Sequence, residues 1–223
     1  MSHPQPGKPR CIVYVDGYNW YQAIFKHYPE WKWLNMQRFF EVLRPRQSVE
    51  LVKVFSALIC DAEARGRQER YFATLKTLPK VRVILGAFQP REVQCRAQCG
   101  QRYVVQDEKK TDVNMAVEIL SDAVGGACEA MCIVTADSDV QPAVEWVAKN
   151  RRSIELTVLV PSLPAEQRDR RTDDYKTRGL PMMCDFLPLS AIKDLQLPNL
   201  VKLADGTFAV RPATWSERAT TAP

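Results

Sequence analysis

The sequence predicts an α/β fold, in which a mostly parallel central sheet is covered by helices on both faces. Two observations carry this prediction. Short runs rich in β-branched residues alternate along the chain with longer segments of helical periodicity. The short runs are also nearly continuous in apolar residues, which is typical of strands that are buried on both faces of a sheet.

The strands are predicted by their β-branched and apolar content, and they fall at residues 11–15 (CIVYV), 51–58 (LVKVFSAL), 81–88 (VRVILGAF), 131–135 (MCIVT) and 155–160 (ELTVLV). Helical periodicity predicts helices between them, near residues 18–28, 35–43, 62–78, 112–124 and 139–150. In the helix from residue 112, one apolar stripe is expected to comprise Val113, Ala116, Val117, Leu120 and Val124.

The length and composition indicate one domain. The chain has 223 residues, of which 46% are hydrophobic, enough to bury a substantial core. We expect a single domain over residues 11–212, with flexible tails at residues 1–10 and 213–223, where Pro, Ser, Thr and charged residues replace the apolar periodicity. No stretch has the length of a membrane span and no apolar signal core is present, so a cytoplasmic protein without a membrane partner is expected.

The rarer residue types exclude several mechanisms. The chain has two histidines, and His3 lies in the expected tail, which excludes a Ser-His-Asp triad and a multi-histidine metal site. Seven dispersed cysteines suit reduced thiols better than a disulfide framework. The nine glycines form no phosphate-binding loop of the GxGxxG, GKS or GKT type. A formal charge of +5 is compatible with a polyanionic partner.

Acidic residues follow two of the predicted strands and open one helix. Asp16 and Asn19 come after the first strand, Asp137 and Asp139 come after the fourth, and Asp112 starts the helix near residue 111. Parallel strands end at the same edge of a sheet, so these side chains are expected to converge there. The alternative to a shared site is that these residues only cap helices. The Ser-x-x-Gln spacing after Asp137 has the form of a capping box, and acids in the first turn of a helix are favourable.

Converging carboxylates point to a cation. They raise one another's pKa and destabilise a fold unless a positive charge neutralises them. Aspartate oxygens without histidine or thiolate suit Mg²⁺ or Mn²⁺, which can activate water and neutralise charge on a phosphoryl group. The sequence therefore predicts phosphodiester hydrolysis. Asn19 would either orient a metal-bound water or phosphate oxygen or make a helix-start hydrogen bond.

Three motifs carry a resemblance to a known family. The segments YVDGYN, KKTDVNMAVEIL and IVTADSDVQPAV, in this order, resemble the motifs of NYN domains of the LabA-like group, within the PIN-like nuclease superfamily. The resemblance covers residues 11–160, and no family motif carries over beyond it. It implies a PIN-like (Rossmann-like) fold and a metal-dependent ribonuclease, whose catalytic and metal-binding acids fall here on Asp16, Asp112, Asp137 and Asp139, with Asn19 as a further candidate.

A cysteine pair lies ahead of the DVN motif. Similar family members carry a Cys pair followed by Gly there, and this chain has Cys95 and Cys99 with three residues between them. A paired zinc knuckle usually has two intervening residues and needs a second pair, for which Cys128 and Cys132 are the candidates on paper. Because Cys132 falls in a predicted buried strand, we expect ordinary thiols rather than structural Zn²⁺ at Cys95 and Cys99.

The approach to Asp112 is basic, and its candidate nucleic-acid contacts are Arg91, Arg96, Arg102, Lys109 and Lys110. Such residues would contact phosphates without reading sequence, and the expected partner is RNA in single-stranded regions. The alternative is a solvated basic loop. The sequence is also compatible with a homo-oligomer.

The leading functional hypothesis is thus a metal-dependent ribonuclease with a four-aspartate site. The alternative is a non-catalytic PIN-like module that binds RNA or a protein and has a regulatory role. Aspartyl-phosphate chemistry is disfavoured, because its Asp-x-Asp follows the first strand of its fold, where this chain has DGYN.

Overall fold

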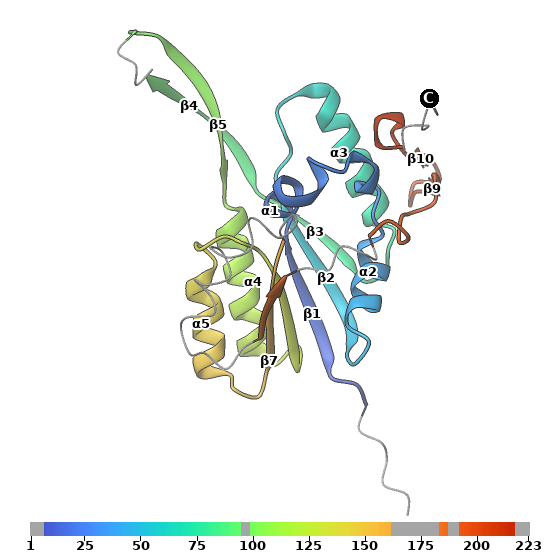
Figure 1. The fold of residues 1–223 in the computed structure, drawn as a ribbon, viewed down its shortest axis with the longest axis vertical. Coiled ribbons are helices and arrows are strands. Elements are labelled where there is room, and N and C mark those ends of the chain that lie inside the picture. Colours follow the sequence, from blue (N-terminus) through green and yellow to red (C-terminus); the bar gives the residue numbers. More distant parts are fainter. Residues whose placement is uncertain (1–6, 95–98, 162–182, 187–191, 217–223) are drawn as a thin grey trace, which may run out of the picture.

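A computed structural model describes residues 7–94, 99–161, 183–186 and 192–216 of the chain. Its centre is a six-stranded sheet in the order β3-β2-β1-β6-β7-β8, and every neighbouring pair of strands in it is parallel (Figure 1). Helices lie on both faces of this sheet. The predicted fold class, an α/β Rossmann-like fold, is confirmed.

The strands of the sheet are β1 (Arg10–Asp16), β2 (Ser48–Ser56), β3 (Val81–Leu85), β6 (Ala130–Val134), β7 (Glu155–Val160) and β8 (Met183–Phe186). The helices are α1 (Gly17–Trp20), which continues as a π-helix over Tyr21–Phe25, then α2 (Met36–Leu43), α3 (Ala62–Leu75), α4 (Thr111–Gly125) and α5 (Gln141–Asn150). Short 3₁₀ helices cover Pro29–Trp31 and Ala213–Trp215, and a small antiparallel hairpin joins β9 (Leu200–Lys202) to β10 (Phe208–Val210).

Alternation along β1 supplies both faces of the core. Val13 and Val15 pack with the aromatic residues of α1 and α2, whereas Ile12 and Tyr14 pack with α4 and α5. All four side chains are buried. The near-continuous apolar run that predicted a strand buried on both faces is therefore explained by the two layers of helices.

The strand order changes direction between β1 and β6. From β1 the chain builds outward through β2 and β3, and it then returns to place β6 on the other side of β1. The carboxyl ends of the strands on either side of such a switch point leave a crevice in which open α/β sheets bind their ligands. Here these ends are Asp16 and Val134, so the candidate site is sought beyond them.

An antiparallel arm separates β3 from α4. Its strands, β4 (Ala87–Gln94) and β5 (Arg102–Lys109), pair with each other and project from the body of the molecule (Figure 1). The predicted strand 81–88 therefore ends early, at Leu85. Gly86 marks the exit, since a Cβ there would lie 2.3 Å from Thr111 Oγ1 and 2.7 Å from the Lys109 carbonyl oxygen.

Two expectations differ from the structure. The apolar stripe predicted on α4 is only partly right, because Ala116 and Leu120 pack against the core whereas Val113, Val117 and Val124 are exposed. The buried residues of the helix are Thr111, Met115, Ile119 and Ala123. Residues 213–215, which fall in the segment expected as the C-terminal tail, also form a 3₁₀ helix. Trp215 is 8% exposed and its ring centroid lies 6.1 Å from that of Trp33.

Among the described residues, no helix combines the length and apolar character of a membrane span.

Candidate active site

Asp16 ends β1 and is buried, with 2% of its surface exposed. Its carboxylate accepts three hydrogen bonds. The Asn19 backbone N–H donates to Oδ1 at 2.9 Å, Asn19 Nδ2 donates to Oδ2 at 2.5 Å, and Thr135 Oγ1 donates to Oδ2 at 2.8 Å. The sequence suggested that Asn19 either orients a ligand or starts the helix, and in the structure it holds Asp16.

Burial dominates the electrostatics of Asp16. It raises the pKa of the carboxyl group, the hydrogen bonds from Asn19 and Thr135 lower it in part, and the nearby Asp137 raises it further. The net direction is upward, because taking a carboxylate out of water penalises the charged form. Asp16 is therefore a better proton acceptor than an ordinary exposed aspartate.

Two further aspartates join Asp16 at this edge. One carboxylate oxygen from each of Asp16, Asp112 and Asp137 lies within 4.8 Å of the others. Asp139 is not part of this cluster. It is exposed, and its backbone N–H donates to Asp137 Oδ1 at 2.9 Å. The sequence predicted four aspartates together, and the structure gathers three of them.

The turn after β6 explains this difference. α5 begins at Gln141 rather than at Asp139, and no side chain caps its N-terminus. The Ser138–Gln141 capping box does not form as such, since the bond between these residues joins the Gln141 backbone N–H to the Ser138 carbonyl oxygen at 3.1 Å. Asp139 lies in the intervening turn and is exposed.

A left-handed residue directs Asp112 into the cluster. Lys110, at the N-cap of α4, has φ 76° and is the one non-glycine residue with positive φ among those that the structure describes. A non-glycine residue pays about 1–2 kcal/mol for this conformation. The turn lets the chain leave the arm and start α4 beneath it, with Thr111 buried and Asp112 in the first turn.

A cavity of about 480 Å³ opens beside Gly17, the residue that follows Asp16. Its walls come from α1 and the π-helix, the end of β2, α3 and the C-terminal 3₁₀ helix. They are mainly aromatic and apolar, and the lining aromatic residues are Tyr18, Trp20, Tyr21, Phe25, Tyr71, Phe72 and Trp215. Such a size and lining are typical of small-molecule sites.

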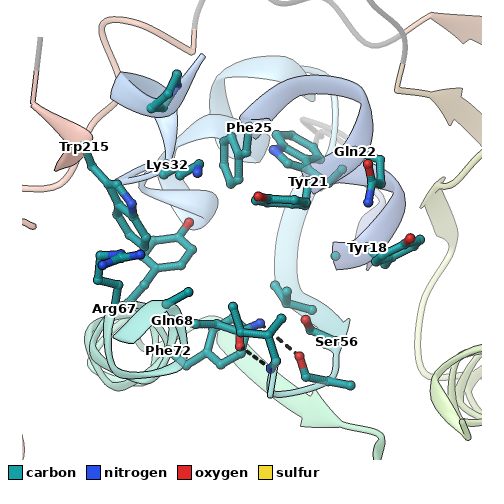
Figure 2. A pocket seen from close by; sticks show the side chains of 18 of the residues that line it. Tyr18, Tyr21, Gln22, Phe25, Lys32, Ser56, Arg67, Gln68, Phe72 and Trp215 are labelled. Atoms are coloured by element: carbon teal, nitrogen blue, oxygen red, sulfur yellow. Dashed lines mark hydrogen bonds between the residues drawn. The ribbon is translucent and has the colours of Figure 1, made fainter. Parts of the chain in front are cut away.

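The cavity has two different ends. Figure 2 shows Lys32, Arg67 and Trp215 toward one end, and Tyr18 and Ser56 toward the other. Ser56 is the last residue of β2, next to the pair formed by Phe55 and Asp16, so its end of the cavity is the one nearer to Asp16 along the sheet.

The floor of the cavity is held by Gln68 of α3. Its Nε2 donates to the Ala57 carbonyl oxygen at 3.0 Å, and its Oε1 accepts from the Ile59 backbone N–H at 3.0 Å (Figure 2). These bonds tie α3 to the segment that follows β2. The loop after β2 is thereby fixed as a wall.

The cavity was missed at the sequence level. Its residues come from segments between Gly17 and Trp215, and no local motif unites them. The available signal is the aromatic-rich segment 18–33. In this segment Trp20, Phe25 and Trp33 are buried, whereas Tyr18 and Tyr21 are 51% and 42% exposed, and all of them except Trp33 line the cavity.

The predicted nucleic-acid contacts lie on and beside the arm. Arg91, Arg102, Lys109 and Lys110 are exposed, and Arg102 forms a 3.8 Å ion pair with Glu92. Arg96 lies outside the described residues. RNA as a partner and a homo-oligomer both stay predictions.

The predicted thiols are only partly described. Cys99 is exposed and Cys95 lies outside the described residues. Cys128 and Cys132, the second pair considered for zinc, are both buried, and burial raises the pKa of each thiol, to about 11 for Cys128 and about 12 for Cys132. A buried thiol with a raised pKa is a packing residue rather than a reactive one.

The chain is similar to a known enzyme. It is 25% identical, over 92% of its own length and 75% of the relative's, to 6-hydroxy-3-succinoylpyridine 3-monooxygenase HspA of Pseudomonas putida (strain DSM 28022 / S16). No protein-family model matches the chain. No solved structure matches it either. The resemblance to NYN domains therefore stays a prediction.

This relative overturns the function predicted from the motifs. A monooxygenase is named for adding oxygen to its substrate, whereas the motifs predicted a nuclease that hydrolyses RNA. The predicted metal-dependent ribonuclease is wrong, and the non-catalytic binding module is not supported, because the match is to an enzyme. The Mg²⁺ or Mn²⁺ cofactor is wrong with it. Acidic groups gather in proteins without an ion, so the cluster does not restore the metal.

Proposed function

We propose that this protein is an enzyme that adds one oxygen atom to a small hydroxylated heteroaromatic compound held in the aromatic cavity. One observation carries the proposal: an aromatic cavity of about 480 Å³ begins at Gly17, directly after the buried carboxylate of Asp16. The ring-binding site thus begins one residue along the chain from a proton acceptor, which does not itself line the cavity. The relative supports the proposal because its name specifies a hydroxylated pyridine as substrate and monooxygenation as reaction.

The cavity suits a planar ring. Tyr21, Phe25 and Trp215 provide aromatic faces and edges, against which a ring ligand gains about 0.5–1.5 kcal/mol per favourable pair beyond the burial of its area. The cavity volume of about 480 Å³ falls in the range of pockets that enclose small organic ligands.

Asp16 has a chemical role in this reaction. A ring hydroxyl that loses its proton gives an electron-rich ring, whose carbon attacks oxygen more readily. A carboxylate with a raised pKa is a stronger base than an ordinary aspartate and can accept that proton. Asn19 and Thr135 hold the carboxylate in place through its hydrogen bonds.

The reaction requires an electron donor. One atom of O₂ enters the substrate, and the other leaves as water after taking up two electrons and two protons. A reduced nicotinamide or flavin supplies these electrons.

A tightly bound dinucleotide does not fit the switch point of this sheet. The first strand-to-helix turn reads Asp16, Gly17, Tyr18, Asn19 and has no glycine-rich phosphate loop. The carboxylate cluster there would also repel a pyrophosphate. We therefore assign the reductant to solution and derive no step through a resident cofactor.

The test is oxygenation of 6-hydroxy-3-succinoylpyridine under ¹⁸O₂. The protein is supplied in turn with NADH, NADPH, and chemically reduced FMN or FAD, and O₂ uptake and the mass of the product are measured. We expect substrate-dependent O₂ uptake and one ¹⁸O atom in the product with at least one donor. Absence of ¹⁸O from the product with every donor would refute the proposal.

A matched pair of variants tests the role of Asp16. Asp16→Asn should lower turnover by about 100-fold or more, which is the usual contribution of a general base. Asp194→Asn makes the same change at an exposed position remote in sequence from the cluster, and it should retain turnover. Equal turnover in the two variants would remove Asp16 from the reaction.

A further inference from the structure

The end of the cavity away from the carboxylates carries two cations. Lys32 and Arg67 both line it, near Trp215 (Figure 2). Lys32 is partly buried, and its Nζ lies 5.0 Å from the ring centroid of Tyr21 and 5.8 Å from that of Trp215. The ammonium group is thus held between aromatic faces at the wall of the cavity.

The charges at this end do not balance. Arg67 Nη1 pairs with Glu63, whose side chain is 84% exposed. Lys32 contacts no carboxylate within the part of the chain that the structure describes. Burial and then the charge of Arg67 lower the pKa of Lys32, so the protein itself disfavours the ammonium charge at this point. A bound anion would relieve both effects.

The opposite end has the opposite sign. Asp16 directly precedes the lining residue Gly17, and its carboxylate gathers with those of Asp112 and Asp137 at the sheet edge, although none of the three lines the cavity. An acidic ligand group would be repelled there and attracted to the lysine end, which fixes the direction in which an elongated ligand lies.

We propose that the cavity takes an aromatic carboxylate, with the ring toward Tyr18 and Ser56 and the carboxylate on Lys32 and Arg67. This inference rests on the proposed function for the reaction at the ring, whereas the ligand class and its orientation stand on the charges of the cavity. Lys32 is then a residue that determines specificity. It selects a ring compound with an acidic side chain over the uncharged equivalent.

The experiment compares acids with their uncharged esters. Two probe pairs are used: 6-hydroxy-3-succinoylpyridine with its methyl ester, and 4-oxo-4-phenylbutanoate with its methyl ester. Binding is followed by tryptophan fluorescence, since Trp20 and Trp215 line the cavity, and by calorimetry. We expect the wild type to bind each acid about 10-fold to 100-fold more tightly than its ester, which is the range of a hydrogen bond to a charged group.

Variants of the lysine assign the effect. Lys32→Met should abolish the preference for the acid, and Lys32→Arg should keep it. The matched control is Lys26→Met, because Lys26 is an exposed lysine of the same segment that contacts Gln22 and does not line the cavity. The preference of the wild type should also fade at a pH below the ordinary lysine range near 10.4, as Lys32 loses its proton early.

The outcomes separate the two proposals. If the preference for the acid depends on Lys32 but no oxygenation is detected, the proposed ligand class is supported and the proposed monooxygenation is refuted. Binding of the phenyl acid alone would support the carboxylate group of the proposed ligand and refute its hydroxypyridine ring. Equal binding of acid and ester by the wild type, an unchanged preference in Lys32→Met, or no binding by any probe would overturn the inference.

Discussion

Replacement of Gly17 by Ala tests the junction between the carboxylate and the cavity. A Cβ at this position would lie 2.6 Å from the carbonyl oxygen of Phe55 and 3.1 Å from Cβ of Ser56. Ordinary contact begins at 3.4 Å, so the new atom is about 0.8 Å too close (3.4 − 2.6) to the backbone of β2. A backbone atom within a sheet cannot rotate away, and the start of α1 must move instead.

This movement should affect both stability and activity. Overpacking of this kind costs about 1–3 kcal/mol, which lowers the melting midpoint of a domain of this size by roughly 2–12 °C. Asp16 and Asn19 flank Gly17 and are joined by hydrogen bonds, so they move with it. A displacement near 1 Å at reacting groups costs about 100-fold in turnover.

The matched control is the same substitution at Gly66. Gly66 lies inside α3, and a Cβ there meets nothing within 4 Å. Alanine in a helix interior should raise stability by about 0.5–1 kcal/mol. Thermal and urea unfolding of the two variants should therefore differ in sign. Gly17→Ala with unchanged or increased stability would refute the close approach of α1 to β2.

Three other variants test separate features. Lys53→Met should lower the free energy of unfolding by about 3–5 kcal/mol in urea titrations, because it leaves Asp122 and a neighbouring glutamate without the buried ammonium they contact at 2.5 Å. Lys110→Gly should leave that free energy unchanged or raise it by about 1 kcal/mol, since glycine adopts φ 76° without strain, and a fall would show that the lysine side chain contributes. Because the fold raises the pKa of Asp16, the wild type should lose stability relative to Asp16→Asn as pH rises from the unfolded-state pKa near 3.9 through the higher folded-state pKa, and parallel unfolding curves against pH would contradict this.

The sheet was predictable because its signal is local. Strands β1, β2, β6 and β7 contain apolar runs, because a strand buried on both faces of a sheet contacts apolar layers on each side. The arm was not predicted as strands, because β4 and β5 are largely polar and pair only with each other. The face of α4 was misassigned for a different reason. The helix carries apolar residues on adjacent faces, and only the packed structure shows that Met115 and Ile119 meet the sheet.

The candidate site divides in the same way. Asp16, Asp112 and Asp137 converge as the order of the strands requires, whereas the position of Asp139 depends on a turn whose conformation the sequence does not specify. The cavity could not be predicted, because its wall includes Trp215, some 200 positions from Gly17. The lack of a carboxylate partner for Lys32 among the described residues could not be predicted either, because it depends on distances between segments that are remote in sequence.

The pairing of the arm has a consequence for variation in chain length. Its strands match residue for residue, from Ala87 opposite Lys109 to Gln94 opposite Arg102. Removing equal numbers of residues from both strands preserves the residue pair at the base of the hairpin, Ala87 with Lys109. The separation of Gly86 from Lys110 is then preserved as well. Insertions and deletions that respect this symmetry therefore alter how far the arm reaches while the start of α4 keeps its place. Evolution can change the reach of the arm independently of the chemistry at the sheet edge.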